Sequence, residues 1–194
     1  MRLLSAKDRI ARPWKNGGGV TRDVAIAPPD ANLDTFDWRI SFADVAGDGP
    51  FSAFVNVDRT LTVVTGEGIA LRFGDEDERA LRRGVPFAFS GDAAATSRLL
   101  AGPIVDLNVM TRRGALAHRV RRIEGAERLR APAPLAFVVC AAGACVLTAP
   151  TGRLALGLYD VADVSGETVE IAPAPGALVL VVEIVMAQGE SAAF

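Results

Sequence analysis

The chain has 194 residues, enough for one large or two small domains, and half of them are hydrophobic, so a substantial core can be buried. The formal net charge of −2 gives no overall bias toward nucleic acid or acidic membranes. The charged N-terminus excludes a secretory signal, and no apolar run reaches the roughly 18 residues of a membrane span. We therefore expect a cytoplasmic protein.

Residues 14–22 combine three consecutive glycines with Lys15, Asn16, Thr21 and Arg22. Consecutive glycines cost conformational entropy, so some local geometry must require them. They would let backbone N–H groups approach a ligand or a neighbouring strand closely, with positive charge beside them. A glycine-rich turn before a first strand is the alternative. The segment lacks the features of a Walker loop and of a dinucleotide fingerprint.

Short runs of β-branched and aromatic residues, bounded by Gly, Pro and Asp, recur along the chain, and helical periodicity is scarce. The first expected strands are residues 20–26, 36–45, 61–64, 69–73, 87–89, 95–100 and 105–110. A second series is expected at 135–140, 144–148, 155–161, 167–171 and 177–185. The chain is therefore predicted to be all-β, with a sandwich or barrel architecture.

The two series of strands resemble each other. Residues 63–71 align without a gap on residues 138–146, which places Gly68 over Gly143. A repeat of about 75 residues is too long for a solenoid and too few in number for a propeller. We expect two fused barrels or jelly rolls, one at residues 1–112 with the ligand pocket and one at 113–194, with exchange of strands between the halves left open.

Strand alternation around Arg39 separates a packing face from a polar face. Trp38, Ile40 and Phe42 share one face, while Arg39, Ser41 and the small Ala43 share the other. The first face is predicted to pack, and the second could line a pocket. An Arg39 on solvent is the alternative, because arginine on a half-exposed strand is common.

A second strand shows the same alternation. Asp106 and Asn108 lie on the face opposite Leu107 and are candidates for the cavity that Arg39 would face. Arg59 precedes a strongly apolar strand and could point into a barrel mouth, with an exposed surface turn as the alternative.

Cations and hydrogen-bonding side chains coincide in these segments. Such a set suits a carboxylate, because arginine binds it bidentately while amides and hydroxyls orient the rest of a small polar ligand. The candidate ligand-binding residues are Lys15, Asn16, Gly18, Thr21, Arg22, Arg39, Ser41, Arg59 and Asn108.

The sequence favours neither a metal nor another cofactor. His118 is the only histidine, and two cysteines with one histidine do not easily build a zinc site. We expect His118 to face solvent in an arginine-rich connector, and no serine lies in a nucleophile motif that a triad would need. Reduced, buried thiols are expected at Cys140 and Cys145, with a cross-strand disulfide as the alternative.

The connector, residues 112–130, is basic but contains no aromatic residue and is interrupted by Glu124 and Glu127. Nucleic-acid binding would need a continuous positive face, so we interpret this segment as a solvated connector.

Five segments resemble the HutD/Ves family in order and spacing over the first 110 residues: PWKNGGGVTR at 13–22, FDWRIS at 36–41, GPFS at 49–52, DR at 58–59 and DLNVM at 106–110. The resemblance implies a two-cupin fold of the RmlC-like superfamily, built from double-stranded β-helix (jelly-roll) barrels without the usual cupin metal. It also implies an association, in many bacteria, with histidine utilisation. Two departures are Val55-Asn56, where Pro-Gly often stands, and Asp23, where glutamate is usual.

The resemblance implies a non-catalytic accessory or regulatory protein that binds a small carboxylate, with urocanate and formylglutamate as candidates. The alternative from another class is a metal-free cupin enzyme, an isomerase or hydrolase of a small acid or sugar derivative, with Lys15 or Asp106 as proton-transfer group. A third reading is a scaffold that docks a pathway regulator protein. A homodimer stays open, and neither nucleic acid nor a membrane is expected as a direct partner.

Overall fold

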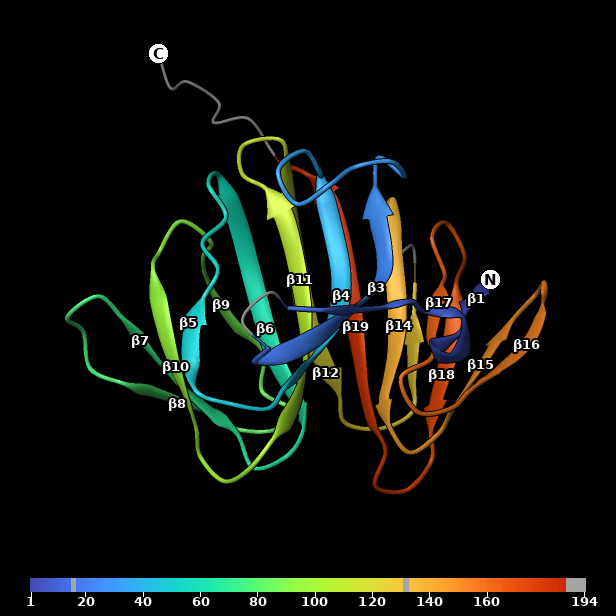
Figure 1. Ribbon diagram of the computed structural model, residues 1–194. Helices are drawn as coiled ribbons and strands as arrows, with labels where there is room; N and C mark the ends of the chain where they lie inside the picture. Colours follow the sequence, from blue (N-terminus) through green and yellow to red (C-terminus); the bar gives the residue numbers. More distant parts are fainter. Residues whose placement is uncertain (15–16, 131–132, 188–194) are drawn as a thin grey trace, which may run out of the picture.

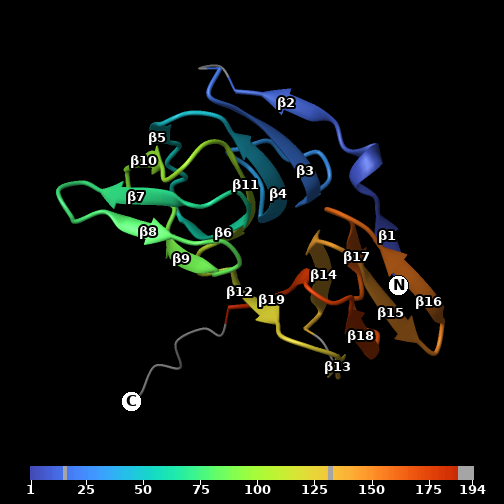
Figure 2. The same cartoon turned by 90° about the horizontal axis from the view of Figure 1, so that it is seen from below.

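The computed structural model describes residues 1–14, 17–130 and 133–187. These residues form nineteen strands and one short 3-10 helix, η1 (Ala6–Asp8), so the all-β prediction is confirmed. The strands belong to four sheets, and Figure 2 shows the sheets stacked as successive layers.

The N-terminal half contains two of the sheets. The six-stranded sheet has the order β2 (Ala11–Pro13), β3 (Gly19–Ala27), β4 (Trp38–Val45), β11 (Ile104–Arg112), β6 (Val57–Thr65) and β9 (Phe87–Ser90). The four-stranded sheet has the order β5 (Gly49–Phe51), β10 (Ala95–Leu99), β7 (Ile69–Phe73) and β8 (Arg79–Leu81).

The C-terminal half contains the other two. The five-stranded sheet has the order β1 (Arg2–Leu4), β17 (Val161–Asp163), β14 (Leu135–Ala142), β19 (Leu178–Met186) and β12 (Leu116–Ile123). The remaining four-stranded sheet has the order β13 (Glu127–Leu129), β18 (Val169–Pro173), β15 (Cys145–Ala149) and β16 (Gly152–Leu156).

The predicted internal repeat is visible in the strand order. The orders β4-β11-β6-β9 and β5-β10-β7-β8 recur as β12-β19-β14-β17 and β13-β18-β15-β16. Each half is therefore a two-sheet jelly-roll sandwich, and no strand pairing among the described residues closes its two sheets into a continuous barrel. β1 pairs with β17, so the first residues add a strand to the C-terminal half. The division at 112/113 into two domains stays a prediction.

One expected strand is wrong in its extent. Residues 155–161 do not form a single strand, because β16 ends at Leu156 and β17 begins at Val161. A turn separates them, in which the Gly157 N–H donates to the Asp160 side chain (3.0 Å) and Tyr159 has a φ of 64°. Six strands were not anticipated: β1, β2, β5, β8, β12 and β13.

The arginine-rich segment is also not a solvated connector. Its middle forms β12, which pairs with β19 along its whole length. Leu116 and Val120 pack against the core between the halves, while Arg119 and Arg122 point to solvent. Arginines at 119, 121 and 122, which occupy both faces of the strand, conceal its period-two pattern in the sequence.

The two large sheets pack face to face at the centre of the molecule. Ile40 and Phe42 of β4 and Leu107 of β11 are buried there against Phe137 and Leu180 of the C-terminal half. The predicted packing faces of β4 and β11 are thus confirmed. Because side chains alternate along a strand, the opposite faces of β4 and β11 look into the N-terminal sandwich.

The interior of the C-terminal sandwich is an apolar cluster that includes both cysteines. Both thiols are free and buried, as expected, and burial raises the pKa of Cys140 to about 12 and that of Cys145 to about 11. Among the described residues, every buried polar or charged side chain belongs to the N-terminal half.

Candidate functional site

A cavity of about 530 Å³ lies inside the N-terminal sandwich, between the six-stranded sheet and β5. In Figure 1, β2 crosses in front of this sheet, and β2 contributes Arg12 and Pro13 to the cavity wall. The remaining lining residues are Trp14, Thr21, Leu33, Arg39, Ser41, Ala43, Pro50, Phe51, Ser52, Phe54, Arg59, Asp106, Asn108 and Met110.

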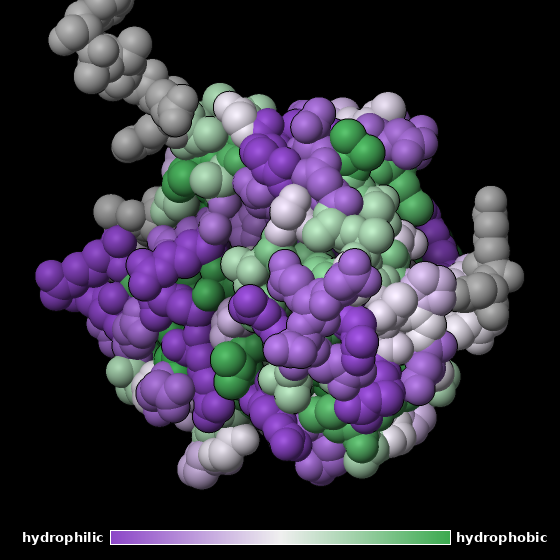
Figure 3. All heavy atoms as spheres, turned by 90° about the vertical axis from the view of Figure 1, so that its left-hand side faces the viewer, coloured by the Kyte–Doolittle hydropathy of each residue, from purple (hydrophilic) through white to green (hydrophobic). Residues whose placement is uncertain are grey.

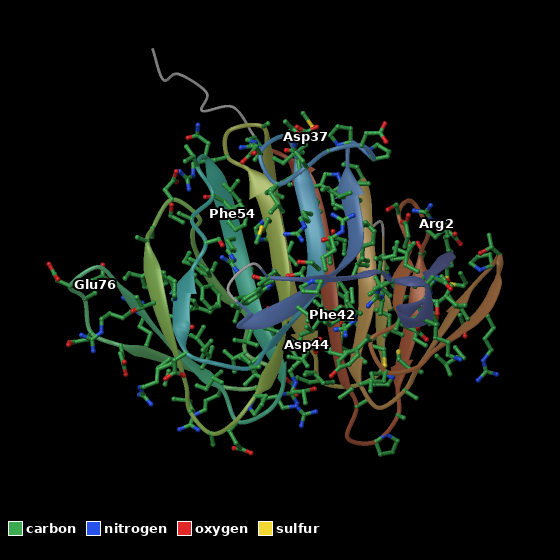
Figure 4. All side chains as sticks on the ribbon, viewed as in Figure 1. Arg2, Asp37, Phe42, Asp44, Phe54 and Glu76 are labelled. Atoms are coloured by element: carbon green, nitrogen blue, oxygen red, sulfur yellow. The ribbon has the colours of Figure 1, made fainter. Side chains whose placement is uncertain are left out.

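Arg59 is a buried cation of the cavity, with 7% of its surface exposed. Its guanidinium lies over the rings of Phe51, Phe54 and Phe89, at 4.9, 5.7 and 5.3 Å from their centroids. Figure 4 shows Phe54 beside β6, the strand that carries Arg59. Burial lowers the pKa of Arg59 to about 10, partly offset by the charge of Asp106. Arg59 is therefore a desolvated cation held by aromatic rings.

Asn108 connects Arg59 to Asp106. Arg59 donates from Nε (2.9 Å) and Nη2 (2.7 Å) to the amide oxygen of Asn108, and the Asn108 amide nitrogen donates to Asp106. Since arginine has no acceptor, the amide orientation of Asn108 is fixed by Arg59. Asp106 is 1% exposed, and its Oδ2 has no hydrogen-bond partner among the described residues.

Arg39 differs from Arg59 because a carboxylate neutralises it. Its Nε donates to Oδ1 of Asp23 at 2.7 Å, and Arg12 lies 3.5 Å from the other oxygen of Asp23. Ser41, on the same face of β4, is 2% exposed and lines the cavity. The cavity thus combines two arginines, Arg12 and Arg39, that share the carboxylate of Asp23 with Arg59, which no carboxylate among the described residues bonds directly.

The described residues of the glycine motif bring Trp14 against the start of β3. The Trp14 N–H donates to the Gly19 carbonyl (2.9 Å), and the Trp14 indole donates to the Thr21 hydroxyl (2.7 Å). A Cβ on Gly19 would lie 2.4 Å from the Asp44 carbonyl oxygen and 3.0 Å from the Trp14 ring. A close approach of Trp14 to the sheet therefore requires glycine at position 19.

Five of the nine candidate residues line the cavity: Thr21, Arg39, Ser41, Arg59 and Asn108. Their common placement follows from the registers of β3, β4, β6 and β11, in which Thr21 pairs with Ala43 and Asn108 pairs with both Ser41 and Leu61. Lys15 and Asn16 lie outside the described residues. Gly18 is not among the lining residues, and its carbonyl accepts from the Ala46 N–H at 3.0 Å.

Arg22 was wrongly placed in the cavity. It follows Thr21 in β3, so the two side chains point to opposite faces of the sheet. Arg22 instead forms an ion pair with Asp44. Figure 4 shows Asp44 and Asp37 at opposite ends of β4, with the cavity-lining residues of this strand between them.

The aromatic residues around Arg59 are the main part of the site that sequence reasoning missed. Phe51 and Phe54 surround Arg59 from the segment around β5, whose three-residue length gives no periodicity to detect. The loop that leads from Phe54 to Arg59 keeps a tight turn without Pro-Gly, because Asn56 adopts a φ of 58°. Asparagine tolerates this left-handed conformation better than most residues.

We expected His118 to face solvent in a connector, and this expectation is wrong. It lies in β12 between two hydroxyls, 2.9 Å from that of Thr60 and 2.7 Å from that of Thr111. Burial lowers its pKa to about 4, which keeps the ring neutral at pH 7. His118 thereby links the sheets of the two halves.

Within the described ranges, no three His, Cys, Asp or Glu side chains gather in a way that could hold a metal ion. The same part of the chain contains no helix long and apolar enough to cross a membrane. The acidic tip of the β7–β8 hairpin, marked by Glu76 in Figure 4, projects far from the cavity.

Two jelly-roll sandwiches, with a polar cavity in the N-terminal one, define a cupin-like protein. Solved structures at low identity share this fold, among them an oxalate decarboxylase from Bacillus subtilis (11% identity, TM-score 0.64, covering 94% of this chain and 76% of that chain). At this identity the likeness concerns the fold alone.

The chain belongs to the HutD family, whose family model matches residues 6–179. An uncharacterized 21.2 kDa protein in the hutC 3′ region of Pseudomonas putida is 36% identical over 162 residues, covering 82% of this chain and 84% of that protein. Protein Ves of Citrobacter koseri is 40% identical over 109 residues, covering 56% of each.

Two solved structures of similar chains have the same fold throughout. A conserved protein of unknown function from Pseudomonas aeruginosa PAO1 is 30% identical with a TM-score of 0.87, covering 95% of this chain and 98% of that chain. HutD from Pseudomonas fluorescens SBW25 is 29% identical with a TM-score of 0.83, covering 96% and 99%.

Proposed function

We propose that this protein is a non-catalytic binding protein for a small carboxylate, with an accessory or regulatory role in histidine utilisation, and that it senses urocanate or formylglutamate. The observation that carries the proposal is Arg59, a buried cation that lines the cavity and has no directly bonded carboxylate among the described residues.

The unused donors of Arg59 support a carboxylate as the ligand. A guanidinium has five N–H groups, and Arg59 uses three of them on Asn108 and, at 3.4 Å, on the Ser52 carbonyl. Removing a cation from water is costly unless an anion or hydrogen bonds compensate. A ligand carboxylate would supply both, and the cavity volume falls in the usual range for small-molecule sites.

The names of the relatives support the proposed link to histidine utilisation. One of them is a protein in the hutC 3′ region, and a structural relative is named HutD. Urocanate and formylglutamate are carboxylates of that pathway, and each carries further polar groups that Ser41, Thr21 or Arg39 would orient.

Calorimetric titration tests this proposal. We expect wild-type protein to bind urocanate or formylglutamate and Arg59→Met to lose at least a hundredfold in affinity, because a charge-assisted pair is removed in a desolvated site. Arg22→Met is the matched control, since Arg22 lies on the opposite face of the sheet and pairs with Asp44. Its affinity should stay within about threefold of wild type.

Two results would contradict the proposal. One is absence of heat, and of thermal stabilisation, at millimolar concentrations of both acids, since any ligand specific to the folded state must stabilise it. The other is equal loss of affinity in the Arg59 and Arg22 variants.

The second candidate function, a metal-free cupin enzyme, is favoured by one observation. Asp106 is buried at the cavity with a free oxygen, and burial raises its pKa to about 7, in the range of a general acid or base. Conversion of either acid, followed by NMR and abolished in Asp106→Asn, would favour the enzyme. Binding without turnover favours the non-catalytic role.

A further inference from the structure

Asp106 is placed unusually for a group that only supports its neighbours. One carboxyl oxygen accepts from Asn108, while Oδ2 is buried at the cavity and has no partner among the described residues. An ionised oxygen without any hydrogen bond in such a position is strongly disfavoured. A proton on Oδ2 would remove this charge.

The charges that face Asp106 come from two neighbouring strands. Arg59 of β6 is linked to it through Asn108 and favours its ionised form, whereas Asp44 of β4 disfavours that form. Arg39 of β4 is already paired with Asp23. Arg59 therefore shares its charge with Asp106 when the cavity is empty, and any ligand carboxylate competes with Asp106 for the same cation.

We propose that the cavity takes up a carboxylate together with one proton and that Asp106 holds this proton. The inference rests on the proposed carboxylate-binding function and adds its regulation by pH.

The proton balance is simple. When Asp106 is ionised, a carboxylate enters, replaces it as the counter-ion of Arg59, and Oδ2 of Asp106 takes one proton from solvent. When Asp106 is already protonated, the carboxylate enters without proton uptake. No covalent bond other than this O–H forms or breaks.

The range in which this coupling acts follows from burial. Burial is the largest cause that raises the pKa of Asp106, to about 7. Affinity should thus be constant below that pH and weaken above it, with the sign set by the proton taken up on binding. Arg59 stays charged over this range, because its pKa is about 10.

The test uses acetate, whose charge is constant above pH 6, with binding followed by NMR from pH 6 to 8.5. For wild type we expect the dissociation constant to rise roughly tenfold for each pH unit above the Asp106 pKa. Asp106→Asn, which is neutral and similar in shape, should bind at every pH within about threefold of the wild-type value at pH 6. Asp44→Asn should keep the wild-type slope and move its onset to lower pH, because Asp44 pairs with Arg22 outside the cavity and disfavours ionised Asp106.

Infrared spectroscopy of the ligand-free protein gives a second readout. We expect the carbonyl band of a protonated carboxylic acid to disappear as pH rises through about 7 in wild type and to be absent from Asp106→Asn. Acetate binding that is equally tight at pH 6 and 8.5 would overturn the inference and leave carboxylate binding intact. Failure to bind acetate at any pH would overturn both.

Discussion

Arg59, Asn108 and Asp106 connect a cation of the cavity to a buried acid through one amide. Arg39 beside them is already bonded to Asp23, which Arg12 also contacts, so Arg39 suits the orientation of a polar ligand better than its capture. Arg59 is thus the strongest candidate for binding a carboxylate, although four cations were candidates in the sequence.

At the residue scale, the glycines of the motif are not equivalent. Gly19→Ala should destabilise the fold by roughly 1–3 kcal/mol, because the new Cβ would clash with the Asp44 carbonyl and the Trp14 ring. It should also weaken carboxylate binding, since Trp14 lines the cavity. Gly47→Ala is the control, because no atom lies within 4 Å of its added Cβ. Denaturant unfolding measures the stability of both variants. Equal stability of the two would refute the close packing of Gly19 against Trp14 and Asp44.

The sequence predicted the site residues that lie on regular strands. Alternation placed Arg39, Ser41 and Asn108 correctly, because each lies in a strand of eight or nine residues. The same rule excludes a common face for Thr21 and Arg22, which are neighbours in β3. The role of Arg59 could not be decided, since the choice between a surface turn and the cavity depends on the pairing of β6 with β11.

At the scale of single elements, β12 shows how composition can hide a strand. Its arginines suggested a solvated segment, yet β12 pairs with β19 and carries His118 to the hydroxyls of Thr60 and Thr111. Long-range pairing of this kind has no local signature in the sequence.

His118 should make stability depend on pH. Its pKa is lowered to about 4 in the folded protein, so the unfolded chain binds a proton first as pH falls from about 6.5. The stability of wild type relative to His118→Gln should therefore fall by roughly 2–3 kcal/mol between pH 6.5 and 4. Denaturant unfolding of both proteins across this range measures the difference. A constant difference would mean that His118 is protonated alike in both states.

Asp106 acts in the opposite direction over nearly the same range. Its pKa is raised in the folded protein, so its contribution to stability falls as pH rises from about 4 to 7. Both effects are present in wild type and offset each other. For this reason the His118 effect is read from the difference between wild type and variant, in which the Asp106 contribution cancels.

At the scale of the whole molecule, the two halves share one topology and differ in their interiors. The repeat was predictable, because hydrophobic spacing and Gly68 and Gly143 recur at equivalent positions. The difference between the interiors of the two sandwiches was not predictable, since it depends on which strand faces pack against each other. The N-terminal sandwich holds the polar cavity, while the C-terminal one is filled by apolar side chains.

The outer surface has fewer features of a binding site than the interior of the N-terminal sandwich. On the face in Figure 3, hydrophilic residues predominate and hydrophobic ones lie in small separated patches. A second depression, of about 330 Å³, is lined by residues near the N-terminus that include Ser5, Asp8 and Arg9. Arg9 is less buried there than Arg59 is in the cavity, and it bonds the Leu4 carbonyl. A direct observation of a bound ligand therefore has to distinguish between the cavity and this depression.

A crystal structure of the protein soaked with formylglutamate tests the central claim most directly. We predict a ligand carboxylate inside the N-terminal sandwich, within hydrogen-bonding distance of the Arg59 guanidinium and enclosed by Phe51 and Phe54. A ligand seated only in the depression beside Arg9, or a cavity that holds water alone at saturating formylglutamate, would contradict the account.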